Sequence, residues 1–401
     1  MFGFNVAVLV IESNLLRLLN DLRSLYGKVV QVHTINVIWV RCSNKQTTVH
    51  PKFTVIMSAI FKINCLKASM VAVFLLFLQA TFAQGSFAAL DQALEENKKL
   101  LGKDISVAVV NADTILYQKN IGDVQPKTPI PVGASSQWFT TALILQLADE
   151  GKLSLDDKIT QYLPVFDSYR KGYLTIRHCL THQTGIGREG FKVAALFEKS
   201  KFNMLEEAVL DIAKKDIHAN AGEEFRYSNY GMVIVARIAE VVTKKRFEQL
   251  MRTRIFVPLG MRNTSFVTDD GSAPNPANGA KSTAADYAKF LQMLLNGGKA
   301  GGKQILSEAA VQEMRKVQLL PQQSALLPKT TQGYAFALGS WAIDNNTPPG
   351  SPANMLTLPS FNGIWPVVDF TRKQAMVVLA KEFSGEQRPD VYLNLKDKVP
   401  R

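Results

Sequence analysis

Residues 133–159 constrain the fold of this chain more than any other segment. They read GASSQWFTTALILQLADEGKLSLDDKI, with small polar residues at the start and a long, mostly apolar run in the middle. The apolar run ends at Gly151, and a glycine just past the last turn commonly ends a helix. The segment therefore predicts a long apolar helix over residues 138–151.

The pattern of the other elements indicates how this helix is surrounded. Helical spacing of apolar residues predicts a helix at 87–101, and two strand-like runs around Asn111–Asp113 predict a hairpin. Residues 156–285 show helices and loops without convincing runs of alternating strand residues. The later patterns predict helices at 287–296 and 307–318 (Ser307 as N-cap), strands at 334–343, 364–370 and 375–380, and a helix from about Asp390.

This order of elements predicts an α+β fold that is interrupted by a helical insertion. Residues of about 85–155 and 286–395 are expected to form the α/β part. Residues of about 156–285 are expected to form the helical subdomain. A chain of 401 residues is long enough for one large core or two modest ones.

A leader-like segment precedes this domain. Residues 57–84 read MSAIFKINCLKASMVAVFLLFLQATFAQ, with lysines at the start, an apolar core and small residues before Gln84. This composition predicts a secretory signal peptide over residues 57–83, too short for a comfortable membrane span. We therefore expect a periplasmic or secreted protein, with residues 1–56 absent from its mature form. The alternative is a genuine extension with an amphipathic anchor helix at residues 5–19.

Charge and cysteine content exclude several classes of function. The formal net charge is +12, and residues 1–83 contribute eight Lys and Arg against two Asp and Glu. No basic stretch is interleaved with aromatic residues on one face, so nucleic acid is not an expected partner. Of three cysteines, only Cys179 lies beyond the predicted leader, and it is expected to pack as a small apolar group. We expect no metal and no cofactor.

Several further segments carry a family resemblance. They are LTIRHCLTHQTGI at 174–186, AGEEFRYSN at 221–229, VPLGMRNT at 257–264, STAAD at 282–286 and LLNGG at 294–298. With residues 133–159, they resemble the serine β-lactamase and penicillin-binding-protein superfamily, in particular its branch of class C β-lactamases, D-Ala-D-Ala carboxypeptidases and esterases. The resemblance covers roughly residues 88–395 and implies the DD-peptidase/β-lactamase-like fold, an antiparallel sheet flanked by helices with an all-α insertion subdomain.

The decisive motif of that superfamily is degenerate in this chain. Its members begin the first helix with Ser-x-x-Lys, and the register set by Phe139 and Thr140 places Ala134 at the serine and Gln137 at the lysine. Shifting the register to Ser135 or Ser136 finds no lysine either, since none occurs between residues 127 and 152. Acyl transfer needs a hydroxyl and a group that takes its proton, and neither Ala134 nor Gln137 provides one.

The second motif of the superfamily, Tyr-x-Asn, is present as Tyr227–Ser228–Asn229. The resemblance implies that Tyr227 would shuttle a proton and that Asn229 would hydrogen-bond a substrate amide. A phenol becomes a useful base only when nearby cations stabilise the phenolate, and Gln137 is neutral. The alternative is that Tyr227 fills a cleft wall while Ser228 or Asn229 caps the next helix.

The third motif, Lys-Thr-Gly or His-x-Gly, has lost its cation. No histidine follows His218, and the best equivalent is Thr357–Ser360. A formal Ser-x-x-Lys at Ser168–Lys171 is expected to be a solvated loop. His178 and His182 are expected to satisfy helix ends.

The sequence favours a β-lactamase-related protein without serine acyl transfer that binds a ligand or partner. The main-chain donors of an oxyanion hole are expected to survive the loss of side chains, so a peptidoglycan-type peptide, a β-lactam or an ester is an expected ligand. The alternative is an active acyl hydrolase that uses Ser135 or Ser136, together with Tyr227 and Asn229. A third class, a membrane-tethered interaction protein, requires that the signal segment is retained.

Overall fold

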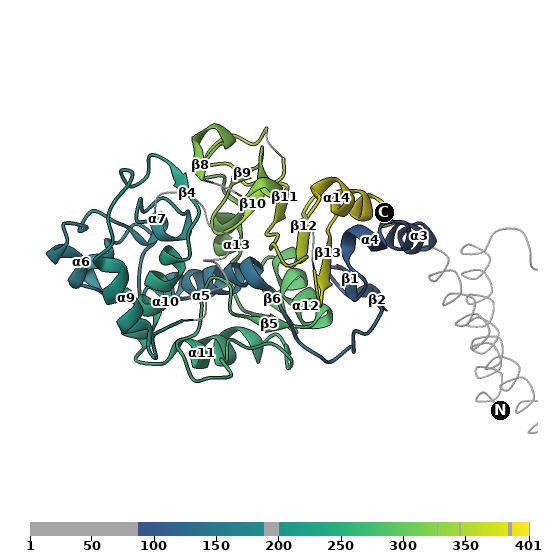
Figure 1. The fold of residues 1–401 in the computed structure, drawn as a ribbon, viewed down its shortest axis with the longest axis horizontal. Coiled ribbons are helices and arrows are strands. Elements are labelled where there is room, and N and C mark those ends of the chain that lie inside the picture. The colour runs from purple at the N-terminus through teal and green to yellow at the C-terminus, as the bar shows by residue number, and fades with distance from the viewer. Residues whose placement is uncertain (1–86, 188–199, 327, 345, 384–386, 401) are drawn as a thin grey trace, which may run out of the picture. The chain divides into compact units, whose positions relative to one another are not determined.

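The structure is a computed structural model that describes residues 87–187, 200–326, 328–344, 346–383 and 387–400. Its centre is a seven-stranded sheet in the order β2-β1-β13-β12-β11-β10-β9, in which every neighbouring pair is antiparallel (Figure 1). The strands are β1 (Ile105–Asn111), β2 (Ile115–Ile121), β9 (Ala335–Phe336), β10 (Trp341–Ala342), β11 (Met355–Thr357), β12 (Trp365–Asp369) and β13 (Gln374–Ala380).

The register of the sheet brings the two ends of the domain together. Strand β1 pairs with β13 from Ile105 opposite Ala380 to Asn111 opposite Gln374. The β1–β2 hairpin turns at Asn111, whose Oδ1 accepts hydrogen bonds from the N–H groups of Asp113 and Thr114. Side chains of a strand alternate between its faces, so these central strands are apolar on both sides and bury two separate cores.

One face of the sheet is covered by α3 (Ala88–Glu96) and α14 (Pro389–Asp397), which meet over β1 and β13 (Figure 1). Alternate residues of β1, such as Val107 and Val109, belong to this core. Trp365 of β12 stacks on Tyr392 of α14 with ring centroids 4.6 Å apart. These contacts fix both chain ends of the domain to the same side of the sheet.

The other face packs against α12, and the helical insertion lies beyond it (Figure 1). The helices of this side are α5 (Gln137–Asp149), α6 (Val165–Ser168), α7 (Ile176–Leu180), α9 (Leu205–Ala213), α10 (Tyr230–Thr243), α11 (Phe247–Leu250), α12 (Ala284–Leu295) and α13 (Glu308–Arg315). The α+β arrangement predicted from the order of elements is therefore confirmed. The boundaries of the helical subdomain, at about residues 156 and 285, stay a prediction.

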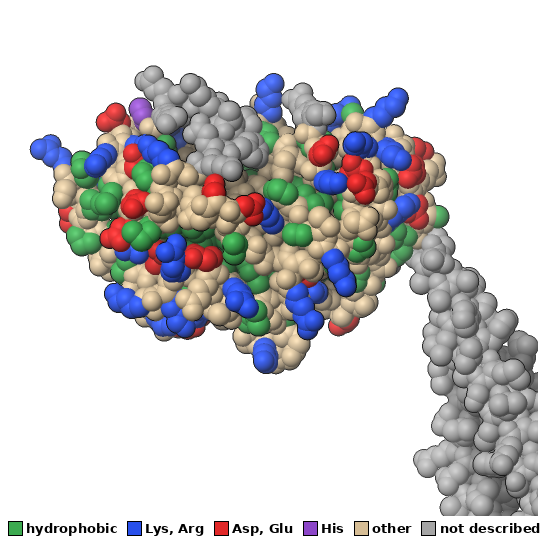
Figure 2. All heavy atoms as spheres, turned by 60° about the horizontal axis from the view of Figure 1, so that its bottom comes forward, with side chains coloured by type: hydrophobic (Ala, Val, Ile, Leu, Met, Phe, Trp, Pro, Cys, Tyr) green, Lys and Arg blue, Asp and Glu red, His purple; other side chains and the backbone are tan. Residues whose placement is uncertain are grey.

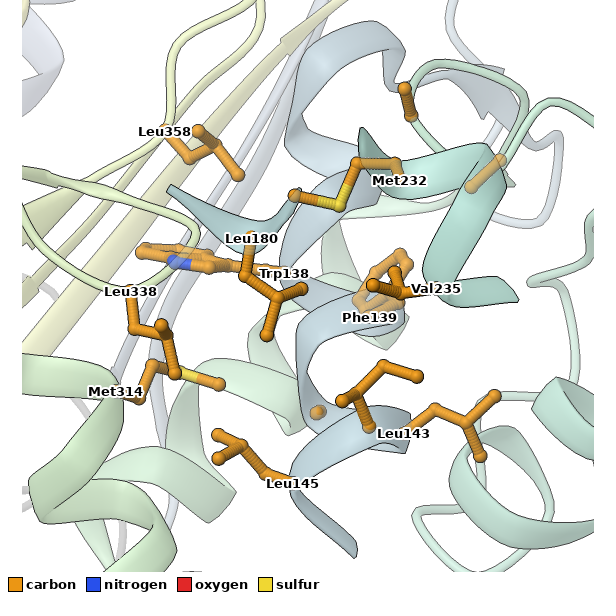
Figure 3. Close-up of a cluster of buried hydrophobic side chains, with 14 of the residues drawn as sticks. Trp138, Phe139, Leu143, Leu145, Leu180, Met232, Val235, Met314, Leu338 and Leu358 are labelled. Atoms are coloured by element: carbon orange, nitrogen blue, oxygen red, sulfur yellow. The ribbon is translucent and has the colours of Figure 1, made fainter. Parts of the chain in front are cut away.

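Helix α5 runs through the larger core and is surrounded by apolar side chains (Figure 3). Phe139 lies with its ring centroid 4.9 Å from that of Phe290, 5.0 Å from that of Tyr287 and 5.3 Å from that of Phe256. The helix ends as predicted, with Gly151 in the left-handed region at φ +67°. Because ten of its thirteen residues are buried, α5 holds its N-terminal turn rigidly in place.

Most predicted elements are present, but two differ from the sequence pattern. The segment 334–343 is not one strand: β9 and β10 form a tight hairpin around Gly339, whose φ is +71°. The Ala337 N–H donates to the Ser340 carbonyl across this turn, which a continuous strand would not allow. The helix predicted at 87–101 is interrupted at Asn97, which ends α3 and precedes a short helix α4 (Lys98–Leu101).

Surface charge on the described residues is mixed. Figure 2 shows basic and acidic side chains interspersed over one face of the molecule, without a large field of one sign. None of the helices in the described ranges is both long and apolar enough to cross a membrane. The predicted signal peptide and the predicted non-mature extension at residues 1–56 lie outside the described residues.

Candidate functional site

The predicted site begins with a single turn of 3-10 helix at Gly133–Ser136 that leads directly into α5. Gly133 has φ +53°, and a Cβ atom at this position would collide with the side chain of Ser360. A glycine is therefore needed both for the left-handed backbone and for the close approach of the Ser360 loop. Ala134 in this turn and Gln137 at the start of α5 are both buried.

Ala134 contributes a methyl group where a nucleophile is expected, and its N–H is already bonded. This N–H donates to Ser360 Oγ at 3.0 Å, and the Ser360 N–H donates to the Ile364 carbonyl at 2.9 Å. The nucleophile's own N–H is a common oxyanion donor in serine hydrolases. The expectation that main-chain donors stay open therefore fails at Ala134, because a hydroxyl of the same chain occupies this donor.

Gln137 joins two other side chains in a buried chain of hydrogen bonds. Its Nε2 donates to Tyr227 Oη at 2.6 Å, and its Oε1 lies 3.0 Å from His182 Nε2. The His182 Nδ1 atom lies 3.5 Å from the Ser228 N–H. With the proton of His182 on Nε2, His182 donates to Gln137 Oε1 and Gln137 Nε2 donates to Tyr227, and all three side chains are neutral.

Burial fixes the protonation of these groups. Desolvation lowers the pKa of His182 to about 3. Desolvation also raises the pKa of Tyr227 well above its usual value, because the hydrogen bond from Gln137 only partly offsets it. At neutral pH the cluster therefore contains a phenol and a neutral imidazole, with neither a phenolate nor a cation.

His182 is the site residue that sequence reasoning missed. His178 does satisfy a helix end, since its side chain and Thr175 form the capping box of α7. His182 instead stacks against Tyr227, with ring centroids 4.6 Å apart, and contacts Gln137. Its backbone is left-handed at φ +55°, which turns the ring away from α7 and into the cluster. No local sequence pattern indicates this role, because it depends on contacts with Gln137 and Tyr227, which are distant in the sequence.

The hydroxyls of Ser135 and Ser136 are both buried and both engaged. Ser135 Oγ donates to the Leu358 carbonyl at 2.5 Å. Ser136 Oγ donates to the Gly133 carbonyl at 2.6 Å and accepts from the Ala280 N–H at 3.0 Å. These hydroxyls therefore hold the turn to its neighbours.

Asn229 lies at the N-cap position of α10, but its side chain does not cap the helix. Its Oδ1 accepts from Asn278 Nδ2 at 2.7 Å, which links α10 to the segment before β5 (Lys281–Ser282). The structure thus brings Gln137 and Tyr227 together as the motif register predicts. Asn229 is joined to Asn278.

Residues 357–360, the predicted equivalent of the third motif, contact the turn at Gly133–Ser136. Residues 357–360 follow β11, and Thr357 Oγ1 is used within the sheet, donating to the Pro366 carbonyl at 2.7 Å. Ser360 supplies the acceptor for Ala134. In the formal Ser-x-x-Lys, residues 168–170 are exposed as predicted, and Ser168 is the last residue of α6. The prediction is wrong for Lys171, which is buried with its Nζ 2.5 Å from the Ala213 carbonyl and 2.6 Å from the Lys215 carbonyl.

No group of three or more His, Cys, Asp or Glu side chains within the described ranges is arranged to hold a metal ion. Cys179 is fully buried in the larger core, where desolvation raises the pKa of its thiol. Neither observation adds a reactive group to the site.

Comparison with solved structures identifies the same fold in several acyl-group enzymes. A Bacteroides dorei protein described as a candidate β-lactamase is 26% identical with a TM-score of 0.67, over 78% of this chain and 98% of that one. EstCE1, a hydrolase with promiscuous acyltransferase activity, has a TM-score of 0.65 at 20% identity, over 79% and 99% of the two chains. The D-alanine carboxypeptidase AmpC of Burkholderia cenocepacia has a TM-score of 0.60 at 17% identity, over 80% and 99%.

Curated relatives match over a shorter region. Protein flp of Staphylococcus aureus strain MW2 is 29% identical over 172 residues, which are 40% of this chain and 34% of that protein. β-Lactamase-like protein 2 of Dictyostelium discoideum is 27% identical over 206 residues, 47% of this chain and 37% of that one. The matched regions thus span little more than a third of these relatives. The Beta-lactamase family model matches residues 90–396, and the chain therefore belongs to the β-lactamase family.

Proposed function

We propose that this chain is a penicillin-binding-protein-like member of the β-lactamase family that binds an acyl-type ligand without serine acyl transfer. The observation that carries the proposal is the buried, neutral chain formed by Gln137, Tyr227 and His182 beside the methyl group of Ala134. A nucleophilic hydroxyl, a base and an open oxyanion donor are all required for acylation. At the motif positions, the first two are replaced and the third is occupied by Ser360.

The magnitudes favour this conclusion over a weakened enzyme. Loss of the nucleophile in a serine hydrolase lowers turnover by about a million-fold, while binding and oxyanion contacts alone retain roughly a thousand-fold over water. An oxyanion donor that is already hydrogen-bonded lowers this residual activity further, since one such donor contributes about a hundred- to a thousand-fold to the rate of turnover. A site of this kind is left with recognition as its function.

The alternative, an active hydrolase that uses Ser135 or Ser136, is disfavoured by the contacts of both hydroxyls. Each donates to a main-chain carbonyl of its own surroundings, and both side chains are fully buried. Neither Ser135 nor Ser136 has a lysine one helical turn away, at Trp138 or Phe139. To act as a nucleophile, either hydroxyl would need a different local structure.

The family and its neighbours suggest the ligand class. A D-alanine carboxypeptidase and a family VIII carboxylesterase share this fold, so we propose a peptidoglycan-type peptide, a β-lactam or an ester as the ligand. We also propose export to the periplasm or the exterior, on the composition of residues 57–83. In that case the chain would contact a membrane only if this segment were retained.

Steady-state hydrolysis tests the proposal. The purified chain is expected to hydrolyse nitrocefin and p-nitrophenyl acetate no faster than its Ser135→Ala and Ser136→Ala variants do. Each variant is first compared with the parent by thermal unfolding, because both hydroxyls hold the turn in place. Turnover that is present in the parent and disappears when one of these serines is replaced would overturn the proposal and establish the hydrolase.

A further inference from the structure

A pocket of about 330 Å³ lies at the C-terminal end of α10, between the start of α9 and the start of α11. Helix α10 contacts both of these helices (Figure 1). Because α10 has 14 residues, this pocket lies about 20 Å along the helix from Asn229 and Tyr227. We propose that it binds a phosphate ester with an apolar substituent, at a place separate from the candidate site.

The pocket is held in shape by polar contacts between the three helices. Arg237 Nη2 of α10 lies 2.9 Å from Glu206 Oε2 of α9. The N–H of Phe247, the first residue of α11, donates to Glu240 Oε1 of α10 at 2.9 Å, and Arg237 Nη1 donates to Glu240 Oε2 at 3.1 Å. Both oxygens of Glu240 therefore have partners already, and the walls of the pocket are formed before a ligand binds.

The charge that lines this pocket is mostly positive. Four of its lining residues are Lys or Arg, and Glu240 is the one carboxylate among them. Arg237 and Arg246 are both paired with carboxylates. Lys244 and Lys245 are exposed, and neither has an ion-pair partner among the residues that the structure describes. These two lysines therefore carry the charge that is available to an anion.

The backbone at Lys244 brings three cations to the pocket in succession. Lys244 is the C-cap of α10 in the left-handed region, at φ +59°, and its N–H donates to the Glu240 carbonyl at 2.8 Å. Glycine or asparagine is usual at such a position, because a larger side chain disfavours this backbone. A cation here also interacts favourably with the dipole of α10, but that interaction needs no pocket. Lys244, Lys245 and Arg246 all line the pocket, and phosphate has enough acceptor oxygens for several such donors.

The remaining part of the pocket is apolar. It is lined by Met204 and Leu205 at the start of α9 and by Val241 of α10. Met204 is 44% exposed, and a methionine side chain adapts to irregular apolar groups. An inorganic anion would leave this surface in water, whereas an alkyl or acyl chain next to the phosphate would cover it. Apolar surface beside unpaired cations is thus complementary to a phosphate ester.

Titration of the purified chain with hexyl phosphate, followed by phosphorus NMR, tests the proposal. Hexyl phosphate is expected to bind about ten-fold more tightly than inorganic phosphate, because its chain buries apolar surface. Hexanol, which has the chain without the charge, is expected to compete only weakly. Binding of hexyl phosphate is also expected to weaken as the salt concentration rises, since exposed charges are screened.

The double variant Lys244→Asn with Lys245→Gln removes the two unpaired charges and is expected to weaken binding about ten-fold. Asparagine tolerates the left-handed backbone at residue 244, so the fold is retained. The matched control is Lys299→Gln with Lys303→Gln, at exposed lysines of the hairpin formed by β6 (Lys299–Ala300) and β7 (Lys303–Gln304). It loses the same charge and is expected to bind as the parent does.

Met204→Ser tests the apolar part separately. Met204 is the N-cap of α9 without a side-chain cap, and serine is a favoured residue at that position, so the helix is preserved. This variant is expected to weaken binding of hexyl phosphate and to leave binding of inorganic phosphate unchanged.

Vesicles of phosphatidylglycerol identify the source of the phosphate ester. Flotation with these vesicles that depends on Lys244 and Lys245 indicates a lipid head group. Binding of hexyl phosphate without such flotation indicates a soluble ester. Three outcomes would each overturn the site: no binding of hexyl phosphate, equal binding of hexyl phosphate and inorganic phosphate, or equal effects of the two double variants. None of them bears on acyl transfer, so the proposed function is tested independently.

Discussion

Gln137 determines the chemistry that the candidate site can perform. A buried lysine at this position would need an anionic partner or water molecules to stabilise its charge. The neutral carboxamide of Gln137 instead donates to Tyr227 and accepts from His182 within a buried cluster. Hydrogen bonds of this kind stabilise one another in a low-dielectric interior. Burial holds Tyr227 as a neutral phenol, because desolvation raises its pKa more than the hydrogen bond from Gln137 lowers it.

Restoring the lost groups tests this account of residue 137 and of Ser360. Ala134→Ser with Gln137→Lys supplies a hydroxyl and an amine one turn apart, but Ser360 Oγ still accepts the N–H of residue 134. We therefore expect labelling by a fluorescent penicillin to be about a hundred-fold faster once Ser360→Gly is added, because an oxyanion donor is released. The rate of labelling is measured by gel fluorescence.

The Ser360→Gly variant without the other two changes is the control, and it should remain unlabelled. Thermal unfolding identifies any variant that fails to fold. If the double and triple variants react at the same rate, Ser360 does not limit access to the donor.

Burial of His182 makes the stability of the folded protein depend on pH. Its pKa is about 3 in the folded state and about 6.5 in a model peptide, so the unfolded chain binds one more proton between these values. Stability is therefore retained above pH 6.5 and lost as the pH falls towards 3, at about 1.4 kcal/mol per pH unit for this one group. Urea unfolding at pH 7 and pH 5 should show a loss to which His182 contributes about 2 kcal/mol.

His182→Phe, which keeps a ring beside Tyr227, should reduce the loss between pH 7 and pH 5 by that amount. His218→Asn, at an exposed histidine, is the matched control and should behave as the parent does. An equal loss of stability in the His182→Phe variant and the parent would show that this imidazole is not buried in a neutral form.

Helix α5 connects the site to the core at the scale of single elements. The 3-10 turn before it carries Ala134 and its first residue is Gln137, while Trp138, Phe139 and Leu143 extend from the helix into the larger core (Figure 3). The site positions are therefore rigid because the rest of the helix is packed on all sides. A change deep in this core is expected to affect stability first and the site only as a consequence.

Phe139→Ala tests how far α5 depends on its aromatic contacts. The ring is fully buried against Phe256, Tyr287 and Phe290, so its loss should lower the free energy of unfolding by about 3–5 kcal/mol. Leu100→Ala, at a side chain that is 40% exposed on α4, should change it by less than about 0.5 kcal/mol. Similar effects of both substitutions in urea unfolding would contradict the assignment of α5 to the core.

Sequence patterns predicted the elements best where local and tertiary preferences agree. Residues 105–110 and 375–380 are apolar strands buried on both faces, and they pair with each other in the centre of the sheet. The pattern failed at 334–343, where the left-handed Gly339 bends a strand-like run into a hairpin. It failed at Lys171 as well, because the carbonyls that this lysine contacts belong to a distant helix end.

At the scale of the whole molecule, the family is recognisable because many segments of the chain carry it. The family model spans residues 90–396, and one sheet organises both cores of that region. The chemistry, in contrast, depends on a few side chains in the turn before α5 and on the loop that faces it. Replacement of these residues leaves the fold intact, which is why fold and activity have to be argued separately.

The candidate site could be predicted from the sequence only in part. The family resemblance implied that Gln137 and Tyr227 share one site, and the structure brings these two residues together. The bond from Ala134 to Ser360 and the place of His182 depend on segments that are far apart in the sequence. No local pattern specifies such contacts, since they arise from the packing of loops against α5.

The most direct test of the account is the intact mass of the purified chain after incubation with excess benzylpenicillin and, separately, with a fluorophosphonate. A site without a nucleophile, a base or an open oxyanion donor predicts that the mass stays that of the unmodified protein with both reagents. A stoichiometric adduct with either reagent, mapped to Ser135, Ser136 or Ser360, would contradict it.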